Sequence, residues 1–348
     1  METSYNEKEV VRSPMRPSPS PLCNNLAQAA GFVVYAHKCS PCVLSPLSIS
    51  QGVQAAVRRV DTECEDLIYM VMSCLVGGGT WYVVLGTDAG LQVWDQGCSN
   101  LLSKWNFPED EPGPVSHHTS NTALFVRGAA AVVTRDGSPA LCWGSSRGKL
   151  YLAQLLEDGQ LGPASSFTNH IAPITCIGSA YQTSRGQPAD FKNPHNLVSC
   201  DQEGLITLWD AVSTSNLSLA NTISQSSEPV VSVALRRNYM IVARLEGCFQ
   251  VYDMASCSLV GEVVSHSRFL TAMDMHPCKD IIATTSEDAT VNVWTLPLGN
   301  GIKGSTNLLS ALWPNAMPTG IAFCGPSDCD IAVVALDNEE LRVFRAGA

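Results

Sequence analysis

The sequence predicts an all-β fold built from a repeated unit of short strands. Three observations predict it: an internal repeat runs through most of the chain, apolar and polar residues alternate over short stretches, and no helical periodicity extends over a helix-sized window. The composition agrees, because 45% hydrophobic residues against 15% charged residues suit a large core. The 26 Gly and 20 Pro suit a chain with many turns.

The repeated unit is an apolar strand, a tight turn with an acidic residue and Gly or Ala, and an alternating strand that ends in an aromatic residue. Its clearest copies are 82–95, 197–210 and 282–294. Weaker copies end at Tyr252 and Phe344, and another ends at Ala153, where the aromatic residue is lost. Successive ends lie from 42 residues (Tyr252 to Trp294) to 59 residues (Trp94 to Ala153) apart. This spacing predicts a β-propeller with inserted loops, since such repeats are about 40–45 residues long.

The two ends of the chain bear on the number of blades. Two apolar runs, 32–37 and 43–49, precede the first clear unit and are typical of a degenerate seventh blade. The chain stops just after the third strand of its last unit, at Phe344, which would leave a strand edge unpaired. We expect N-terminal residues to complete that blade, because ring closure removes the exposed edge. The sequence therefore predicts one domain at 22–348 with seven blades, or alternatively six.

Residues 1–21 are rich in Ser and Pro and are predicted to form a disordered tail. The tail contains three Ser-Pro steps, at Ser13, Ser18 and Ser20, which proline-directed kinases could modify. An unmodified tail is the alternative. Two inserts, 108–120 and 182–194, account for the longer repeats.

The repeat resembles that of the WD-repeat family, in which Trp-Asp closes the third strand, as at Trp94-Asp95 and Trp209-Asp210. The resemblance implies blades that are held by a buried hydrogen-bond network of His, Ser or Thr, Asp and Trp. In the last clear unit, this assigns the network to His266, Thr284, Asp288 and Trp294.

The other units match the family pattern less fully. In the unit that ends at Trp209, the resemblance assigns His170 and Ser199, with Glu203 in place of the turn Asp. In the first clear unit Asp88 and Trp94 match, but Val84 occupies the hydroxyl position and no His precedes it. We therefore expect that blade to lack the network.

Four short segments, 22–26, 266–268, 273–275 and 323–324, further resemble one particular member of the family, and that resemblance runs from residue 22 to residue 344. That resemblance implies a cytoplasmic scaffold without enzymatic activity that can associate with itself. In the family, the residues after each His loop open onto one face around the propeller axis. Here they include Arg268 and Phe269, a pair of the kind that anchors protein partners. The alternative is that Phe269 simply packs into its blade.

Charge and cysteine usage narrow the class of partner and the compartment. The net charge of −11 disfavours binding to nucleic acid and to anionic membranes. The 14 Cys are scattered through apolar segments and are typical of reduced, buried thiols in the cytosol. The uncharged stretch 67–87 is long enough to span a membrane, but Gly77, Gly78 and Gly79 in its middle favour two strands and a turn.

The sequence contains no combination of residues that predicts catalysis. Cys39 and Cys42 have the spacing of half a zinc site, but no second pair completes it. His117 and His118 lie in a Pro- and Gly-rich insert and are expected in a solvated loop. We therefore expect no cofactor, metal or enzymatic activity, and predict a protein-interaction scaffold. A propeller enzyme or small-molecule binder that uses the central channel is the alternative.

Overall fold

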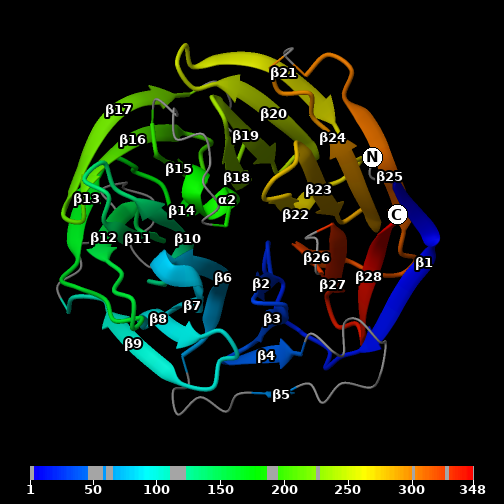
Figure 1. Cartoon of the computed structure of the whole chain (residues 1–348), viewed down its shortest axis with the longest axis horizontal. Helices are drawn as coiled ribbons and strands as arrows, with labels where there is room; N and C mark the ends of the chain where they lie inside the picture. The colour runs from blue at the N-terminus through cyan, green and yellow to red at the C-terminus, as the bar shows by residue number, and fades with distance from the viewer. Residues whose placement is uncertain are drawn as a thin grey trace.

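A computed structural model describes residues 4–45, 58–59, 66–109, 123–185, 195–224, 228–299, 302–325 and 329–347. Seven antiparallel sheets of four strands each surround a central axis, so the all-β, seven-bladed prediction is confirmed (Figure 1). Helical structure in these ranges is limited to one 3-10 turn, η1 (Gly77–Gly79), and one short helix, α2 (Ala180–Thr183). His117 and His118 lie outside the described residues.

Each blade runs outward from the axis through four strands. The innermost strands are β2 (Ala27–Ala29), β6 (Ile68–Val76), β10 (Val126–Val133), β14 (Ile174–Ser179), β18 (Val230–Arg236), β22 (Leu270–Met275) and β26 (Pro318–Cys324). The second strands are β3 (Phe32–His37), β7 (Thr80–Thr87), β11 (Pro139–Ser145), β15 (Leu197–Asp201), β19 (Tyr239–Arg244), β23 (Ile281–Ser286) and β27 (Asp330–Ala335).

The outer half of each blade follows the same order. The third strands are β4 (Ser40–Leu44), β8 (Gly90–Asp95), β12 (Lys149–Gln154), β16 (Ile206–Ser213), β20 (Cys248–Asp253), β24 (Thr290–Thr295) and β28 (Glu340–Gly347). The outermost strands are β5 (Arg58–Arg59), β9 (Leu101–Asn106), β13 (Ser165–Thr168), β17 (Asn216–Ile223), β21 (Ser258–Val264), β25 (Thr306–Leu312) and β1 (Ser4–Pro14).

Burial explains why the strands differ in composition from the axis outward. Inner strands such as β14 are buried along their whole length, so their sequences are nearly continuous apolar runs. Outer strands such as β17 are mostly exposed and correspondingly polar. The hydrophobic core lies in layers between neighbouring blades. One such layer packs Trp209 of β16 against Cys142 and Leu152 of the preceding blade.

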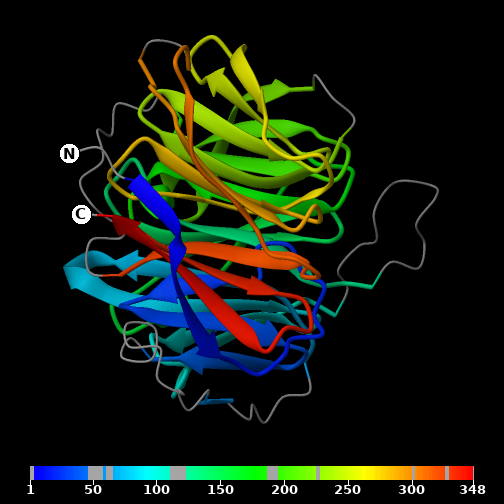
Figure 2. The same cartoon turned by 90° about the vertical axis from the view of Figure 1, so that its right-hand side faces the viewer.

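The ring closes through the N-terminal strand, as expected. β1 pairs antiparallel with β28, from Pro14 opposite Glu340 to Ser4 opposite Gly347, and Figure 2 shows the two strands side by side. The boundary at residue 22 differs from the structure, because 4–14 form a strand of the last blade. Only residues 1–3 of the expected tail lie outside the described chain. Pairing with β28 covers an edge that would otherwise be open.

The serines of the Ser-Pro steps are buried in the closed ring. Ser13, Ser18 and Ser20 are 0%, 1% and 8% exposed, and Ser18 Oγ donates a 2.5 Å hydrogen bond to the Ala36 carbonyl. Phosphorylation of these serines stays a prediction, and in the folded ring it requires the chain around them to open first. Here the tertiary contacts outweigh a local composition that favours disorder.

The uncharged stretch 67–87 forms two paired strands, β6 and β7, joined by η1. Its glycines therefore form a turn, as predicted. Among the described residues, no helix has both the length and the hydropathy needed to cross a bilayer.

Candidate interaction face and the blade networks

The strand order places two kinds of loop at one end of the propeller. Because strands alternate in direction within each blade, the connections between blades and the turns between second and third strands lie at the same end. We call this end the upper face, and the opposite end the lower face. The network residues assigned from the sequence and the pair Arg268 and Phe269 all belong to these upper connections or the strands next to them.

The blade β14–β17 brings three of its assigned residues together in a fully buried chain of contacts. His170 Nε2 lies 2.7 Å from Ser199 Oγ, and the Trp209 indole Nε1 donates to the same oxygen at 2.8 Å. His170 Nδ1 lies 2.8 Å from a carboxylate oxygen of Asp201. The assignment of Glu203 to this contact is wrong. Asp201, two residues earlier, ends β15 and reaches the imidazole, whereas Glu203 donates its backbone N–H to Asp201.

The arrangement of Ser199, His170 and Asp201 has the connectivity of a catalytic triad, but its surroundings differ. Ser199 is 0% exposed and its hydroxyl oxygen is occupied by the Trp209 indole, so a substrate has no approach to it in the folded blade. Both imidazole nitrogens of His170 also have partners. These polar groups satisfy one another, which is what burial requires of them.

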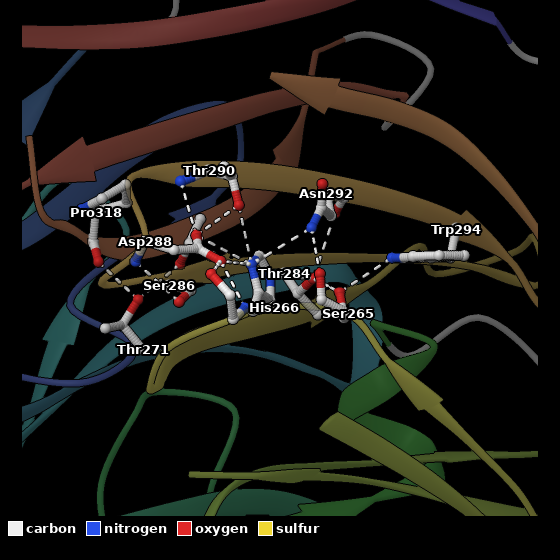
Figure 3. Close-up of polar contacts among 12 residues, drawn as sticks. Ser265, His266, Thr271, Thr284, Ser286, Asp288, Thr290, Asn292, Trp294 and Pro318 are labelled. Carbon is white, nitrogen blue, oxygen red and sulfur yellow. Dashed lines mark hydrogen bonds and ion pairs between the residues drawn. The ribbon is translucent and has the colours of Figure 1, made fainter. Parts of the chain in front are cut away.

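The blade β22–β25 forms a longer version of the same network (Figure 3). His266 Nε2 lies 2.9 Å from Thr284 Oγ1, and His266 Nδ1 lies 3.2 Å from Asp288. The Trp294 indole does not reach Thr284. It donates at 3.1 Å to Ser265 Oγ, which in turn lies 3.0 Å from Thr284 Oγ1. All four assigned residues are thus connected, with Ser265 as an additional member.

Burial and hydrogen bonding oppose each other at the charged end of this network. Burial lowers the pKa of His266, although the Asp288 carboxylate opposes that effect. Burial alone would raise the pKa of Asp288, but its hydrogen bonds from Thr290 and from the Ser267 backbone lower it overall. The neutral imidazole and the ionised carboxylate are therefore both favoured.

In the blade β6–β9, the indole N–H of the closing Trp has a different acceptor, which the sequence did not predict. The Trp94 indole donates at 3.0 Å to Gln92 Oε1, and Gln92 Nε2 donates at 3.2 Å to Asp66. Asp88 accepts a hydrogen bond from the backbone of Leu67 and does not join this chain. Leu85, and not Val84, takes the place that the hydroxyl residue has in the other blades. The reason is that the β7–β8 register is displaced by one residue relative to the β15–β16 register, in which Ser199 lies opposite Thr207.

The blade β18–β21 also uses a Gln to link its closing aromatic residue to a carboxylate. The Tyr252 hydroxyl donates at 2.8 Å to Gln250 Oε1, and Gln250 Nε2 donates at 2.7 Å to Glu262. The same Gln250 oxygen accepts a 3.0 Å hydrogen bond from Arg244 Nε, a side chain with 0% exposure. A Gln two residues before the closing aromatic residue, with an apolar residue opposite it, is the sequence signal common to both blades.

The blade β10–β13 replaces the lost aromatic residue at Ala153 by an aromatic cluster nearby. Trp143 is fully buried and stacks on Tyr151 with ring centroids 5.8 Å apart. Trp105 of the preceding blade packs edge-on against Trp143 at 5.0 Å. This blade is therefore held by packing of rings where its neighbour uses a hydroxyl network.

The lower end of the central channel is closed by the connection after β14. The helix α2 lies in the middle of the ring in Figure 1. Gln182 Nε2 donates at 2.6 Å to the Ser73 carbonyl of β6. Arg185 donates at 2.8 Å to the Phe323 carbonyl of β26 and lies 3.3 Å from Asp274 of β22. This segment therefore ties together inner strands from several blades.

The upper end narrows at Asn24, which bridges two inner strands. Its side-chain amide donates at 2.9 Å to the Val231 carbonyl, and its Oδ1 accepts at 3.1 Å from the Met273 backbone. Between Asn24 and α2 lies a cavity of about 430 Å³. Arg127 lines it and forms no hydrogen bond or ion pair within the described ranges.

In the described connections that lead from one blade to the next inner strand, three large apolar side chains are exposed on the upper face. Leu67, Ile171 and Phe269 are 42%, 63% and 52% exposed. Each lies in the connection that precedes an inner strand, and these strands are β6, β14 and β22, which belong to alternate blades. We call these three residues the apolar rim. Phe269 therefore does not pack into its blade, and Arg268 beside it is exposed too.

The model of the WDR54 family matches residues 8–347 of this sequence, which is nearly the whole ring. The chain belongs to the WDR54 family. It is 25% identical over 346 residues to WD repeat-containing protein 54 of Mus musculus, covering 95% of this chain and 97% of the mouse protein. The Homo sapiens protein of the same name is 23% identical over 345 residues, with the same coverage. The resemblance to this family member, predicted from segments 22–26, 266–268, 273–275 and 323–324, is therefore confirmed.

Two further similarities are partial or structural. A segment of 111 residues is 31% identical to the target of rapamycin complex subunit wat1 of Schizosaccharomyces pombe, covering 30% of this chain and 35% of that protein. A chain in the crystal structure of the mitotic checkpoint complex superimposes with a TM-score of 0.69 at 15% identity, covering 98% of this chain and 92% of that chain. The latter similarity shows the propeller fold alone.

The segments that carried the resemblance to WD repeat-containing protein 54 meet on the channel wall. Asn24 contacts Met273, and the Phe323 backbone N–H donates at 2.8 Å to Asp274. Among the described residues, no cluster of three or more His, Cys, Asp or Glu could hold a metal ion.

Proposed function

We propose that this chain is a non-enzymatic scaffold that binds protein partners through the apolar rim on its upper face. The observation that carries the proposal is the exposure of Leu67, Ile171 and Phe269 around one channel mouth. Exposed apolar groups gain free energy when a partner covers them, and aromatic residues beside Arg are frequent anchors. The fission-yeast relative named as a complex subunit also supports a role in an assembly.

The experiment compares two double variants in a quantitative affinity purification from cells. Ile171→Ser with Phe269→Ser removes two of the three rim side chains. Leu219→Ser with Leu259→Ser removes two equally apolar side chains, 50% and 43% exposed, from outer strands. We expect the rim variant to lose partners that the wild type and the outer-strand variant retain. Recovery of the same partners by both variants would contradict the proposal.

We also propose a cytoplasmic location and no binding to nucleic acid. The described cysteines are free thiols, which suits a reducing compartment. The net charge of −11 supports the second point, because phosphate binding draws on an excess of Lys and Arg. Self-association is a further expectation for this family, and sedimentation of the rim variant beside the wild type would test whether the same face serves it.

A second candidate function is small-molecule binding in the channel. The observation that favours it is Arg127, a guanidinium on the wall of the cavity of about 430 Å³. Native mass spectrometry of protein purified from cells would detect a bound compound. If a compound is found and is lost in Arg127→Met while the rim variant keeps it, the channel and not the rim holds the ligand.

A further inference from the structure

A cysteine on the lower face lies among hydrogen-bond donors. Cys329 directly precedes β27, and His276 and Lys279 follow β22 of the neighbouring blade, so the group lies across the boundary between two blades. His276 Nε2 lies 3.4 Å from Cys329 Sγ, and Lys279 Nζ lies 3.1 Å from it. None of these residues takes part in the networks or the apolar rim described above.

The tautomer of His276 is determined by its other nitrogen. Nδ1 accepts hydrogen bonds from the backbone N–H groups of Cys278 and Lys279, at 3.0 Å and 2.9 Å. Backbone N–H groups can only donate, so Nδ1 carries no proton and the ring proton lies on Nε2. The imidazole therefore donates toward the sulfur of Cys329. Its ring is held in that orientation by edge-on packing against Phe323, at 5.4 Å.

The sulfur of Cys329 thus faces an imidazole N–H and an ammonium group. Both are donors, and the ammonium carries a positive charge, so together they stabilise negative charge that develops on the sulfur during a reaction. Among the described residues, the other titratable groups nearby are Tyr5, Cys324 and Asp330. Burial raises the pKa of Tyr5, and Cys329, Asp330 and Cys324 raise it further. Asp330 is turned toward the backbone of β28, where it accepts a 3.1 Å hydrogen bond from Ala346.

Cys248 offers a matched contrast at the same degree of burial. Cys248 is 4% exposed and Cys329 is 6% exposed. The Cys248 thiol lies 3.4 Å from a carboxylate oxygen of Glu246, to which it donates. Burial, with Glu262 and Glu246, raises the pKa of Cys248 to about 12. The two cysteines therefore differ in the charge of their neighbours and hardly in their exposure.

We propose that Cys329, whose sulfur lies within hydrogen-bond distance of His276 Nε2 and Lys279 Nζ, is a site of oxidation by hydrogen peroxide on the lower face. The thiolate sulfur attacks one peroxide oxygen, the O–O bond breaks, and the sulfur is oxidised to sulfenic acid. The leaving hydroxide takes a proton, which the adjacent Lys279 ammonium is placed to supply, and becomes water. Hydrogen peroxide is nearly as small as water, so limited exposure does not prevent its approach.

The test is peptide mass spectrometry on the full chain after brief treatment with hydrogen peroxide at neutral pH. After quenching with catalase, the protein is denatured and its remaining thiols are alkylated, so that each cysteine reports its own loss. We expect Cys329 to be oxidised at least about tenfold faster than Cys248, and faster than the exposed Cys278. Equal rates at Cys329 and Cys248 would overturn the proposal.

Two variants test the assigned donors. Lys279→Met removes the ammonium, and His276→Asn keeps an acceptor for the two backbone N–H groups while removing the Nε2 donor. Each should slow oxidation of Cys329 about threefold or more, with no change at Cys278. Unchanged oxidation in both variants, with melting temperatures like that of the wild type, would show that His276 and Lys279 do not activate the thiol. If a variant fails to fold, the comparison of Cys329 with Cys248 in the wild type still decides.

Discussion

Two pairs of blades provide the buried donor of their closing aromatic residue with a hydrogen-bond acceptor, and each pair uses different side chains. In β14–β17 and β22–β25, which we call the hydroxyl blades, the closing Trp reaches a carboxylate through hydroxyl groups and a His. In β6–β9 and β18–β21, the glutamine blades, the closing Trp or Tyr reaches a carboxylate through one Gln. In both pairs a buried polar group of the aromatic residue is satisfied by a chain of contacts that ends in an acid.

The difference shows what the fold requires of each blade. All four blades share the four-stranded antiparallel arrangement, although the β7–β8 register is displaced by one residue. The identity of the linking residue is therefore free as long as the donor of the closing aromatic residue finds an acceptor. Where the second strand carries a hydroxyl, the third strand carries Thr207 or Asn292 opposite it. Where it carries Leu85 or Val242, the third strand carries Gln. Polar residues of this kind hold the blades, and the exposed rim remains available for partners.

The largest effect is expected in a hydroxyl blade. Ser199→Ala should lower the free energy of unfolding by about 2–4 kcal/mol, because it leaves both the Trp209 indole and His170 Nε2 buried without that partner. Chemical denaturation measures this. Ser218→Ala, at an exposed position of the same blade, serves as the control and should change stability by less than about 0.5 kcal/mol. Similar losses in the two variants would mean that the network contributes nothing specific.

In the glutamine blade β18–β21, Gln250→Met should cost about 2–3 kcal/mol, because it removes an acceptor from both the Tyr252 hydroxyl and the buried Arg244 guanidinium. Arg244→Met should cost less, since it removes the buried charge along with its contacts. The two variants are compared by denaturant titration under identical conditions. The reverse order would show that Arg244, and not Gln250, is the main support of this blade.

In the other glutamine blade, Gln92→Met should cost about 1–2 kcal/mol, because one neutral donor, the Trp94 indole, loses its acceptor. The shift of the thermal melting temperature measures the effect. Gln202→Met, at an exposed position of another blade, is a suitable control. A loss as large as that of Ser199→Ala would remove the distinction between the two pairs of blades.

The smallest effect is a pH dependence that arises from His266 in the hydroxyl blade β22–β25. Burial lowers the pKa of His266 in the folded protein, so its contribution to stability is complete above the unfolded value of about 6.5 and is lost as the pH falls below it. We expect the wild type to lose more stability between about pH 7.5 and about pH 5.5 than His266→Gln does. Parallel loss in both proteins would show that His266 takes up its proton as readily in the folded chain as in the unfolded one.

The repeat pattern was enough to predict the ring and most of the hydroxyl network. The resemblance to the WD-repeat family assigned His266, Thr284, Asp288 and Trp294, and the structure connects them with Ser265 as a further member. The assignment of Glu203 was wrong, because a carboxylate can reach the His170 imidazole either from the end of the strand or from the turn. Nothing in the aligned positions distinguishes Asp201 from Glu203 until the side-chain directions are known.

Features that depend on distant contacts were not predictable in the same way. The Ser- and Pro-rich start of the chain reads locally as disordered, yet β28 offers it a strand edge more than 300 positions away in the sequence. The roles of Gln92 and Gln250 were not predicted, since Gln is usually exposed. Only their partners, Asp66 and Glu262, explain their burial. The plug of the channel by Gln182 and Arg185 likewise depends on strands from other blades.

The central claim is that partners contact the apolar rim while the blade networks serve the fold, and site-specific photocrosslinking tests it most directly. A photoreactive residue at Ile171 is compared with one at Leu259, a similarly exposed position on an outer strand. The account predicts that position 171 crosslinks a reproducible protein partner in cells and position 259 does not. Equal capture from both positions, or capture from position 259 alone, would contradict it.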